Sequence, residues 1–120
     1  MLRRFVILKH DHPYMHWDLL LEEEESARAW RLLRKPCLCE PIAAEPLPPH
    51  RLLYLDYEGP LSNDRGRVEQ FCTGSYMLDD AGHTRMRVQL LANSFATQAD
   101  MATTPDGRVF FTFSNSGILP

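Results

Sequence analysis

The stretch YMHWDLLL (residues 14–21) decides the fold class of this chain. Its side chains fall on two faces if the chain is extended, because successive side chains of a strand point in opposite directions. One face carries Met15, Trp17, Leu19 and Leu21, and the other carries His16, Asp18 and Leu20. Such a repeat of two residues is typical of a half-buried β-strand. The stretch therefore predicts a strand with an apolar face on the core and a polar pair, an imidazole and a carboxylate, on the other face.

The residues on both sides of this stretch continue the β pattern. Arg4–Lys9 (RFVILK) is rich in β-branched and aromatic side chains, and a turn signal, Asp11-His12-Pro13, separates it from the strand predicted at residues 14–21. Six further segments have strand character: Ala27–Leu33, Arg51–Tyr57, Val68–Phe71, Ser75–Leu78, Thr84–Leu91 and Arg108–Phe113. Seven or eight short strands, spaced by roughly ten residues, predict a mostly β protein with little helix, an antiparallel sandwich or barrel.

The other segments are expected to connect these strands. The proline-rich segment 36–49 should be a surface loop, because proline lacks the N–H group that a helix or a central strand uses. Turns are expected at Gly74, Gly82 and Gly107. Helical turns are expected only in Glu23–Ala27 and around Asn93–Met101.

Length and charge limit the function classes. A chain of 120 residues, 44% hydrophobic and 24% charged, predicts one domain over residues 1–120. Its 13 basic and 16 acidic residues give a net charge of −3, whereas proteins that coat long nucleic acids usually carry a basic excess. Any contact with nucleic acid should therefore be local, at an end or at a single phosphate.

No segment indicates export or membrane insertion. Leu19-Leu20-Leu21 is a typical apolar run here, far short of the ~20 residues of a spanning helix, and the N-terminal residues include no small-residue cleavage site. We expect a soluble, cytoplasmic protein without a membrane partner. Its Cys37, Cys39 and Cys72 should then be reduced, partly buried thiols. No second Cys/His pair at zinc spacing follows Cys37-x-Cys39.

The densest group of metal-capable side chains is His10-Asp-His-Pro-Tyr-Met-His16-Trp-Asp18. His16 and Asp18 share a strand face, with Cα atoms about 6.5–7 Å apart, and His10 ends the preceding strand across a tight turn. Two imidazoles and a carboxylate would leave positions open on a transition metal, as catalytic sites require. The residues alone leave a second interpretation open, in which these are ordinary hydrogen-bonded histidines. His12, in the turn, should be exposed.

A second candidate pair follows the proline-rich segment. His50, Leu52 and Tyr54 share one face if a strand begins this early. His50 could then act as a general acid or as a donor to a phosphate, with Tyr54 as a hydrogen-bond donor beside it. His83 lies in a polar turn and should be solvated. The chain contains no Gly-x-Ser-x-Gly elbow, Walker A loop, dinucleotide-binding glycine motif or Cys-x-x-Cys.

Taken in order, these segments resemble a known family. The matching motifs are Phe5-Val-Ile-Leu-Lys-His10, His16-Trp-Asp18-Leu-Leu-Leu-Glu22, Ala29-Trp30, His50 with Tyr54-Leu-Asp-Tyr-Glu-Gly-Pro60, and Gly66-Arg-Val68 with Gly74-Ser-Tyr76. They resemble the 3′-phosphoesterase domain of bacterial DNA ligase D, a module that also occurs as a short stand-alone protein. The resemblance covers roughly residues 4 to 114.

The resemblance implies a small antiparallel β-barrel and a hydrolase of DNA repair. Such a protein removes 3′-phosphates and 3′-ribonucleosides, so its partners would be DNA or RNA-tipped DNA 3′ ends, beside a separate polymerase and ligase. By position, His10, His16 and Asp18 would bind Mn²⁺, or alternatively Zn²⁺ or another divalent transition metal. His50 would contact the scissile phosphate and Tyr54 would support it.

Several positions depart from the family pattern, and two of them are its phosphate-binding arginines. The family's phosphate-binding arginine on the ligand strand is Leu20 here, and a second arginine, eight residues before the phosphate histidine, is Ile42. A leucine cannot donate to a phosphate, and loss of such a contact commonly costs a few kcal/mol. Arg31 or Arg51 could compensate. The alternative to an active phosphoesterase is therefore a weakened or inactive metal-binding module that binds nucleic-acid ends or a repair partner.

Overall fold

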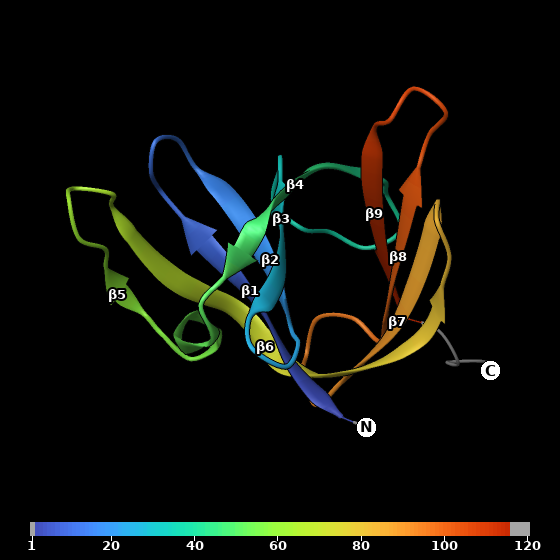
Figure 1. Ribbon diagram of the computed structural model, residues 1–120, viewed down its shortest axis with the longest axis horizontal. Coiled ribbons are helices and arrows are strands. Elements are labelled where there is room, and N and C mark those ends of the chain that lie inside the picture. Colours follow the sequence, from blue (N-terminus) through green and yellow to red (C-terminus); the bar gives the residue numbers. More distant parts are fainter. Residues whose placement is uncertain (1, 116–120) are drawn as a thin grey trace.

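The structure, a computed structural model, describes residues 2–115. Within that range the chain forms strands and one short 3₁₀ helix, η1 (Leu52–Leu55) (Figure 1). The strands are β1 (Arg3–His10), β2 (His16–Glu22), β3 (Ala27–Leu32), β4 (Ile42–His50), β5 (Gly59–Pro60), β6 (Arg67–Ala81), β7 (Arg85–Leu91), β8 (Gln98–Thr103) and β9 (Val109–Ser114). In these residues no helix has the length and apolar character to cross a membrane. The prediction of a mostly β protein with little helix is confirmed.

Eight of the strands close into an antiparallel barrel. The order is β1-β2-β3-β4-β9-β8-β7-β6, and β6 pairs back with β1. β6 has 15 residues, of which the first part pairs with β1 and the last part with β7. β5 pairs with the start of β6, outside the closed ring. Of the two architectures left open by strand spacing, the structure is therefore the barrel.

Gly74 lies inside β6, so the turn predicted there is wrong, and the predicted strands Val68–Phe71 and Ser75–Leu78 are parts of one strand. A Cβ atom on Gly74 would lie 2.3 Å from the carbonyl oxygen of Leu91 and 2.9 Å from the ring of Phe5. Glycine is therefore required where β6 passes from β1 to β7, because any side chain would collide with backbone there.

Strand β4 begins within the proline-rich segment, so the predicted surface loop is wrong over residues 42–49. β4 pairs with β3 along most of its length, but with β9 only through its first three residues. Beyond Ala44 one side of β4 is a free edge, where a missing N–H group removes no ladder hydrogen bond. Pro48 and Pro49 fall where the register with β3 shifts, at a bulge. The prolines of β4 thus occupy the two places in a sheet that tolerate them.

Three other predictions for local structure are also wrong. Arg51–Tyr57 is not a strand, because Leu52–Leu55 form η1. Neither Glu23–Ala27 nor Asn93–Met101 forms a helical turn. In the second segment the side-chain oxygen of Asn93 accepts hydrogen bonds from the backbone N–H groups two and three residues later. This local turn ends before β8 begins.

Two apolar clusters lie on the two sides of the barrel wall. The interior cluster takes residues from all eight barrel strands and includes Phe5, Trp30, Phe111 and Phe113. The outer cluster lies on the opposite face of β1, β2 and β3, where η1 contacts β1 and β2. Its members are Val6, Leu8, Leu20, Ala27, Ala29, Leu55 and Val68. Both faces of β1 and β2 are therefore buried along part of their length.

This second cluster modifies the two-face prediction for YMHWDLLL. Leu19 and Leu21 point into the barrel as expected. Met15, however, precedes β2 and is 45% exposed, and Leu20 on the polar face is fully buried in the outer cluster. The outer face of β2 is thus polar at His16, Asp18 and Glu22, with the buried Leu20 between them.

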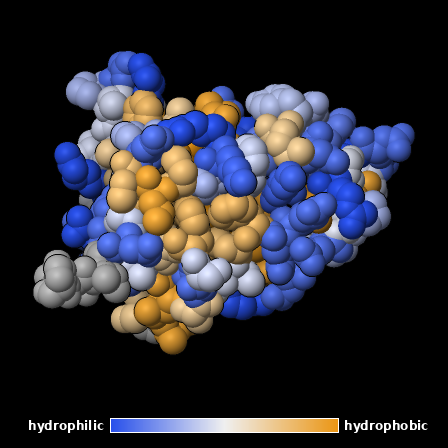
Figure 2. Space-filling view, turned by 180° about the vertical axis from the view of Figure 1, so that it is seen from behind, coloured by the Kyte–Doolittle hydropathy of each residue, from blue (hydrophilic) through white to orange (hydrophobic). Residues whose placement is uncertain are grey.

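Apolar side chains also reach the surface. On the face opposite that of Figure 1, apolar residues gather near the centre, with hydrophilic residues around them (Figure 2). Exposed large apolar side chains among the described residues include Met77, Leu78 and Leu91 of β6 and β7. The barrel wall therefore does not separate apolar from polar residues completely.

Candidate metal centre

His10, His16 and Asp18 meet at one end of the β1–β2 pair. His10 is the last residue of β1 and faces His16, the first residue of β2, in the antiparallel register, while Asp18 faces Leu8. Side chains at alternate positions lie on one face, so all three point to the outer side of the barrel wall. The structure confirms that these residues, which we call the triad, come together as the sequence predicted.

The triad is compact and mostly buried. His16 Nε2 lies 3.3 Å from Asp18 Oδ1, and His10 Nδ1 lies 3.7 Å from Asp18 Oδ2. One ligand atom from each residue lies within 4.8 Å of the others. His16 and Asp18 are 1% and 5% exposed, and the side chain of His10 is 15% exposed. His10 is therefore the member nearest to solvent.

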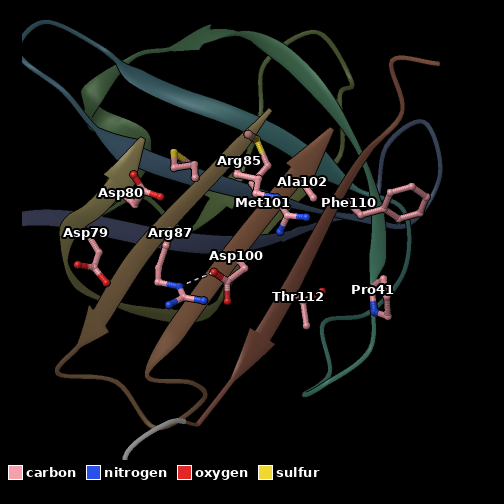
Figure 3. A pocket seen from close by; sticks show the side chains of 11 residues that line it. Pro41, Asp79, Asp80, Arg85, Arg87, Asp100, Met101, Ala102, Phe110 and Thr112 are labelled. Carbon is pink, nitrogen blue, oxygen red and sulfur yellow. Dashed lines mark hydrogen bonds and ion pairs between the residues drawn. The ribbon is translucent and has the colours of Figure 1, made fainter. Parts of the chain in front are cut away.

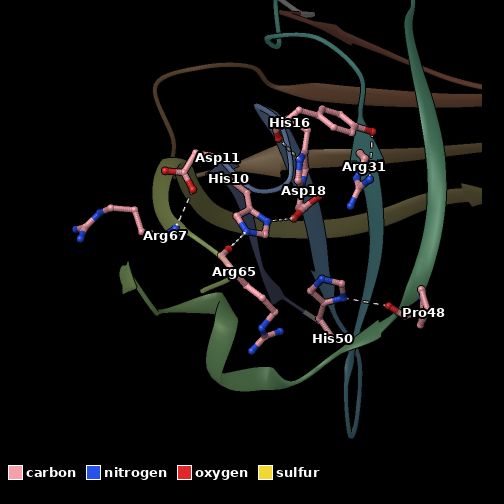
Figure 4. Close-up of polar contacts among 10 residues, drawn as sticks. His10, Asp11, His16, Asp18, Arg31, Pro48, His50, Arg65 and Arg67 are labelled. Carbon is pink, nitrogen blue, oxygen red and sulfur yellow. Dashed lines mark hydrogen bonds and ion pairs between the residues drawn. The ribbon is translucent and has the colours of Figure 1, made fainter. Parts of the chain in front are cut away.

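Backbone carbonyls fix which ring nitrogen faces the centre of the triad. His16 Nδ1 lies 2.9 Å from the carbonyl oxygen of Tyr14, and His10 Nε2 lies 2.9 Å from that of Arg65 (Figure 4). A carbonyl only accepts, so each of these nitrogens carries a proton and donates. In the neutral imidazoles, His16 Nε2 and His10 Nδ1 are then bare lone pairs beside the carboxylate of Asp18. Histidine ligands of metals are held in this way.

Three acceptors thus converge with no donor between them. His16 Nε2 and Asp18 Oδ1 are buried and have no hydrogen-bond partner. Leaving a buried polar atom unpaired costs about 1–3 kcal/mol, more for a charged group. A divalent cation among the three atoms would satisfy all of them at once. As metal ligands, two imidazoles and one carboxylate fit a transition-metal ion and leave some of its coordination positions open.

The turn at 62–66 supports the triad from outside. Asp11 Oδ1 accepts a hydrogen bond from the backbone N–H of Arg67 at 2.9 Å, and this bond lowers the pKa of the Asp11 carboxyl. Gly66 has φ +76°, and a Cβ there would lie 2.1 Å from Asp11 Oδ1. Glycine therefore lets the turn approach closely enough for the Arg65 carbonyl to hold His10. The sequence alone does not indicate this support, because a backbone carbonyl leaves no side-chain signature.

His50 and Tyr54 are brought together, although they do not lie on one strand. His50 ends β4, and Tyr54 lies one helical turn later in η1, with the two ring centroids 6.3 Å apart in an edge-to-face arrangement. His50 Nδ1 lies 3.0 Å from the carbonyl oxygen of Pro48 and donates to it. In Figure 4 the other ring nitrogen is turned toward the side on which the triad lies. The predicted strand face shared with Leu52 does not exist.

Leu20 and Ile42, at which the resemblance expects arginine, are fully buried apolar residues. Leu20 belongs to the outer cluster, two residues from Asp18 on the same face. Ile42 belongs to the interior cluster, on the far side of the barrel wall from the triad. Neither position therefore has room for a charged side chain that reaches a phosphate.

Of the two basic residues that could compensate, the structure places Arg31 beside the triad. Arg31 of β3 faces Asp18 of β2 directly in the antiparallel register. Its Nη1 donates to the hydroxyl of Tyr14 at 3.2 Å, while its buried Nε has no partner. Arg51 is exposed between β4 and η1.

The other histidines and the cysteines lie outside the site. His12 and His83 are exposed, as expected. All three thiols are free, but Cys39 is exposed, whereas Cys37 and Cys72 are partly buried as expected. Burial raises the pKa of Cys72 to about 12, so its thiol stays protonated. Within residues 2–115, no cysteine joins a group of three metal donors.

A hollow lies elsewhere, on the outer surface of the barrel over the last part of β6 and over β7, β8 and β9 (Figure 3). Its volume is about 790 Å³. Its central charges, Arg87 and Asp100, already form an ion pair at 2.7 Å. The triad, in contrast, contains buried polar atoms without hydrogen-bond partners. These unpaired buried atoms, rather than the volume of a cavity, identify the triad as the candidate site.

Comparison with known proteins adds no assignment. No family model matches the chain, and no curated protein matches it either.

Proposed function

We propose that this chain is a metal-dependent phosphoesterase that acts on nucleic-acid 3′ ends, releasing a 3′-phosphate or a 3′-ribonucleoside. One observation carries the metal-dependent part, namely the convergence of two bare imidazole nitrogens and a buried carboxylate with no donor between them. The ordered resemblance to the 3′-phosphoesterase domain of bacterial DNA ligase D supports the substrate class. We propose Mn²⁺ as the ion and DNA or RNA-tipped DNA ends as the partners.

The triad would hold the ion, and the chain supplies the rest of the site. When bound, a divalent ion supplies Lewis-acid stabilisation of charge on phosphoryl oxygens and makes bound water more acidic. The carbonyls of Tyr14 and Arg65 keep both imidazoles in the ligand tautomer. The outer cluster beside Asp18 excludes water from one side of the site, and a low local dielectric strengthens each charge interaction there.

His50 is proposed to act on the phosphate. Because Nδ1 donates to Pro48, Nε2 is the nitrogen that exchanges a proton with the substrate. In its protonated form Nε2–H can donate to a phosphoryl oxygen or to the leaving oxygen as charge develops. The edge-to-face contact with Tyr54 restricts the rotation of the imidazole. Tyr54 therefore positions His50 in this proposal.

A second candidate function is a binding module that retains the ion and does not turn over. The observation that favours it is the burial of Leu20 and Ile42, which removes two expected arginines from the site. Such a module would bind nucleic-acid ends or a repair partner. The two functions share the triad and differ in whether the phosphate is cleaved.

The test is Mn²⁺-dependent release of phosphate or nucleoside from labelled primer–templates that end in a 3′-phosphate or a 3′-ribonucleotide. His16→Ala should abolish release, and His83→Ala, an exposed histidine distant in sequence, should not change it. Release that survives His16→Ala, or that does not need a divalent ion, would contradict the proposal. Mn²⁺ binding that depends on His16, without release by the unmodified chain, would identify the binding module instead.

A further inference from the structure

We infer that Arg31 is the residue that binds the phosphate of the nucleic-acid end, through hydrogen bonds from its guanidinium to non-bridging oxygens. This inference rests on the proposed function, since it names the group that receives the substrate's charge beside the triad. Three observations support it. They are the position of Arg31, its Nε group without an acceptor, and the hydrogen bonds that already engage Arg65 and Arg34.

The register places Arg31 next to the triad. Arg31 and Asp18 are directly opposed on β3 and β2, so their side chains leave the same outer face. Cβ atoms of such pairs lie about 4.5–5.5 Å apart. A guanidinium that starts there reaches the space above Asp18 without any change in the backbone. In Figure 4 it lies on the same side of the strands as His50.

Arg31 has no anionic partner in the structure. The ion pairs found within residues 2–115 do not include it. Its other cross-strand neighbour, Glu45, is exposed and does not pair with it. Its Nε is buried without an acceptor, and its one hydrogen bond is to the neutral hydroxyl of Tyr14. A half-buried cation with a vacant donor is thus held ready for an anion, and a guanidinium matches phosphate in a two-pronged geometry.

Tyr14 connects Arg31 to the triad. Its carbonyl accepts from His16 Nδ1, its hydroxyl accepts from Arg31 Nη1, and the Arg31 guanidinium carbon lies 5.6 Å from its ring centroid. One residue therefore orients both a metal ligand and the guanidinium. This arrangement keeps Arg31 in place without neutralising its charge.

Two other arginines near this end of the barrel, Arg65 and Arg34, are already engaged. Arg65 donates to the backbone oxygen and to the hydroxyl of Ser62. Arg34 pairs with Glu40 and donates to the carbonyl of Pro41. Their donors would have to break existing bonds to reach a phosphate, whereas Arg31 Nε would not.

The experiment measures affinity for a terminal phosphate without turnover. Two labelled oligonucleotides are compared by fluorescence anisotropy in Mn²⁺, one ending in a 3′-methylenephosphonate, which cannot be hydrolysed, and one ending in a 3′-hydroxyl. The unmodified chain should prefer the phosphonate by at least about tenfold. Arg31→Met should remove that preference, and Arg31→Lys should keep part of it. Mn²⁺ affinity, measured by calorimetry, should stay within about twofold, because Arg31 is not a metal ligand.

Arg28→Met is the matched control, because Arg28 lies on the same strand but faces the other way, over the ring of Trp30. It should keep the full preference. A preference that persists in Arg31→Met, or that is absent from the unmodified chain, overturns the inference. Loss in Arg51→Met alone would assign the role to Arg51 and also overturn it. Failure of the proposed function has a different signature, namely no Mn²⁺-dependent release of a hydrolysable 3′-phosphate.

Discussion

His16 Nε2 and Asp18 Oδ1 lie 3.3 Å apart, and neither atom has a hydrogen-bond partner. In the neutral imidazole both are acceptors, because the proton of the His16 ring is then on Nδ1, where it is donated to the carbonyl of Tyr14. Their residues are 1% and 5% exposed, so the two atoms are shielded from bulk solvent. The folded chain therefore holds two facing lone pairs at a cost in stability, as expected of a site organised for a cation.

This relationship predicts that Asp18→Asn stabilises the metal-free chain. An amide N–H in place of the carboxylate oxygen can donate to His16 Nε2, which removes an unpaired acceptor and a buried charge. We expect a gain of about 1–2 kcal/mol in the free energy of unfolding, measured by urea denaturation in a chelator. The same variant should lose the stabilisation by Mn²⁺, which for the unmodified chain is about 2.7 kcal/mol at 100 times Kd.

Asp80→Asn serves as the control, since Asp80 is exposed on β6. It should change neither the metal-free stability nor the response to Mn²⁺. If Asp18→Asn is less stable than the unmodified chain in chelator, Asp18 already has its hydrogen-bond partners without an ion, and the triad is not organised for a cation.

Gly66→Ala should weaken metal binding although Gly66 is not a ligand. A Cβ there would overlap Asp11 Oδ1, and the residue has φ +76°. The 62–66 turn must then move outward, and the Arg65 carbonyl loses its position on His10 Nε2. Loss of such support typically reduces metal affinity by about 10–100-fold. Calorimetric titration with Mn²⁺ measures the change.

Gly107→Ala separates this effect from backbone strain. Gly107 has φ +87°, but a Cβ there would meet no atom within 4 Å. It should cost about 1–2 kcal/mol of stability and leave Mn²⁺ affinity unchanged. Equal loss of affinity in both variants would mean that general destabilisation, and not the support of His10, explains the Gly66 result.

Much of the geometry of the triad could be predicted from sequence, because it results from strand alternation and pairing between neighbouring strands. Alternation in β2 places His16 and Asp18 on one face, and a tight turn brings His10 across from them. Nothing but strand periodicity and hairpin pairing is involved. The identification of a barrel also needed only the number and spacing of the strands together with the resemblance.

The errors arose where long-range pairing overrides local preference. The free edge of β4 depends on its short pairing with β9, and the crowding at Gly74 depends on Leu91 and Phe5 together, so neither Pro48 nor Gly74 signals these features locally. For the same reason, the sequence alone left both Arg31 and Arg51 as candidates for the phosphate contact. Its opposition to Asp18 depends on the β2–β3 register, which strand alternation alone does not set.

The contacts between Arg4 and Glu22 should stabilise the folded chain in a way that depends on pH. Arg4 donates to Glu22 from both its guanidinium and its backbone N–H, and these hydrogen bonds lower the pKa of the Glu22 carboxyl. A lowered pKa in the folded state means that the contribution is present above the unfolded-state pKa and is lost as pH falls through the folded-state pKa. At pH 7, Glu22→Gln should therefore lose up to about 1 kcal/mol.

Urea denaturation of both proteins between pH 7 and pH 3 tests this. The difference in the free energy of unfolding should shrink as pH falls below the usual range of a glutamate. Glu24→Gln, an exposed glutamate in the neighbouring turn, should show little difference at any pH. A gap between Glu22→Gln and the unmodified chain that is constant with pH would show that the ion pair with Arg4 contributes nothing.

Leu20→Arg tests whether the phosphate-binding side of the site has been rebuilt. Leu20 is fully buried in the outer cluster, so an arginine there must bury a charge or displace η1. We expect a loss of about 3 kcal/mol or more in the free energy of unfolding and no gain in Mn²⁺-dependent release. Leu20→Met, which keeps the volume, should cost under about 1.5 kcal/mol. A stable Leu20→Arg protein with raised activity would show that the site accepts an arginine from β2, and that Arg31 does not already fill that role.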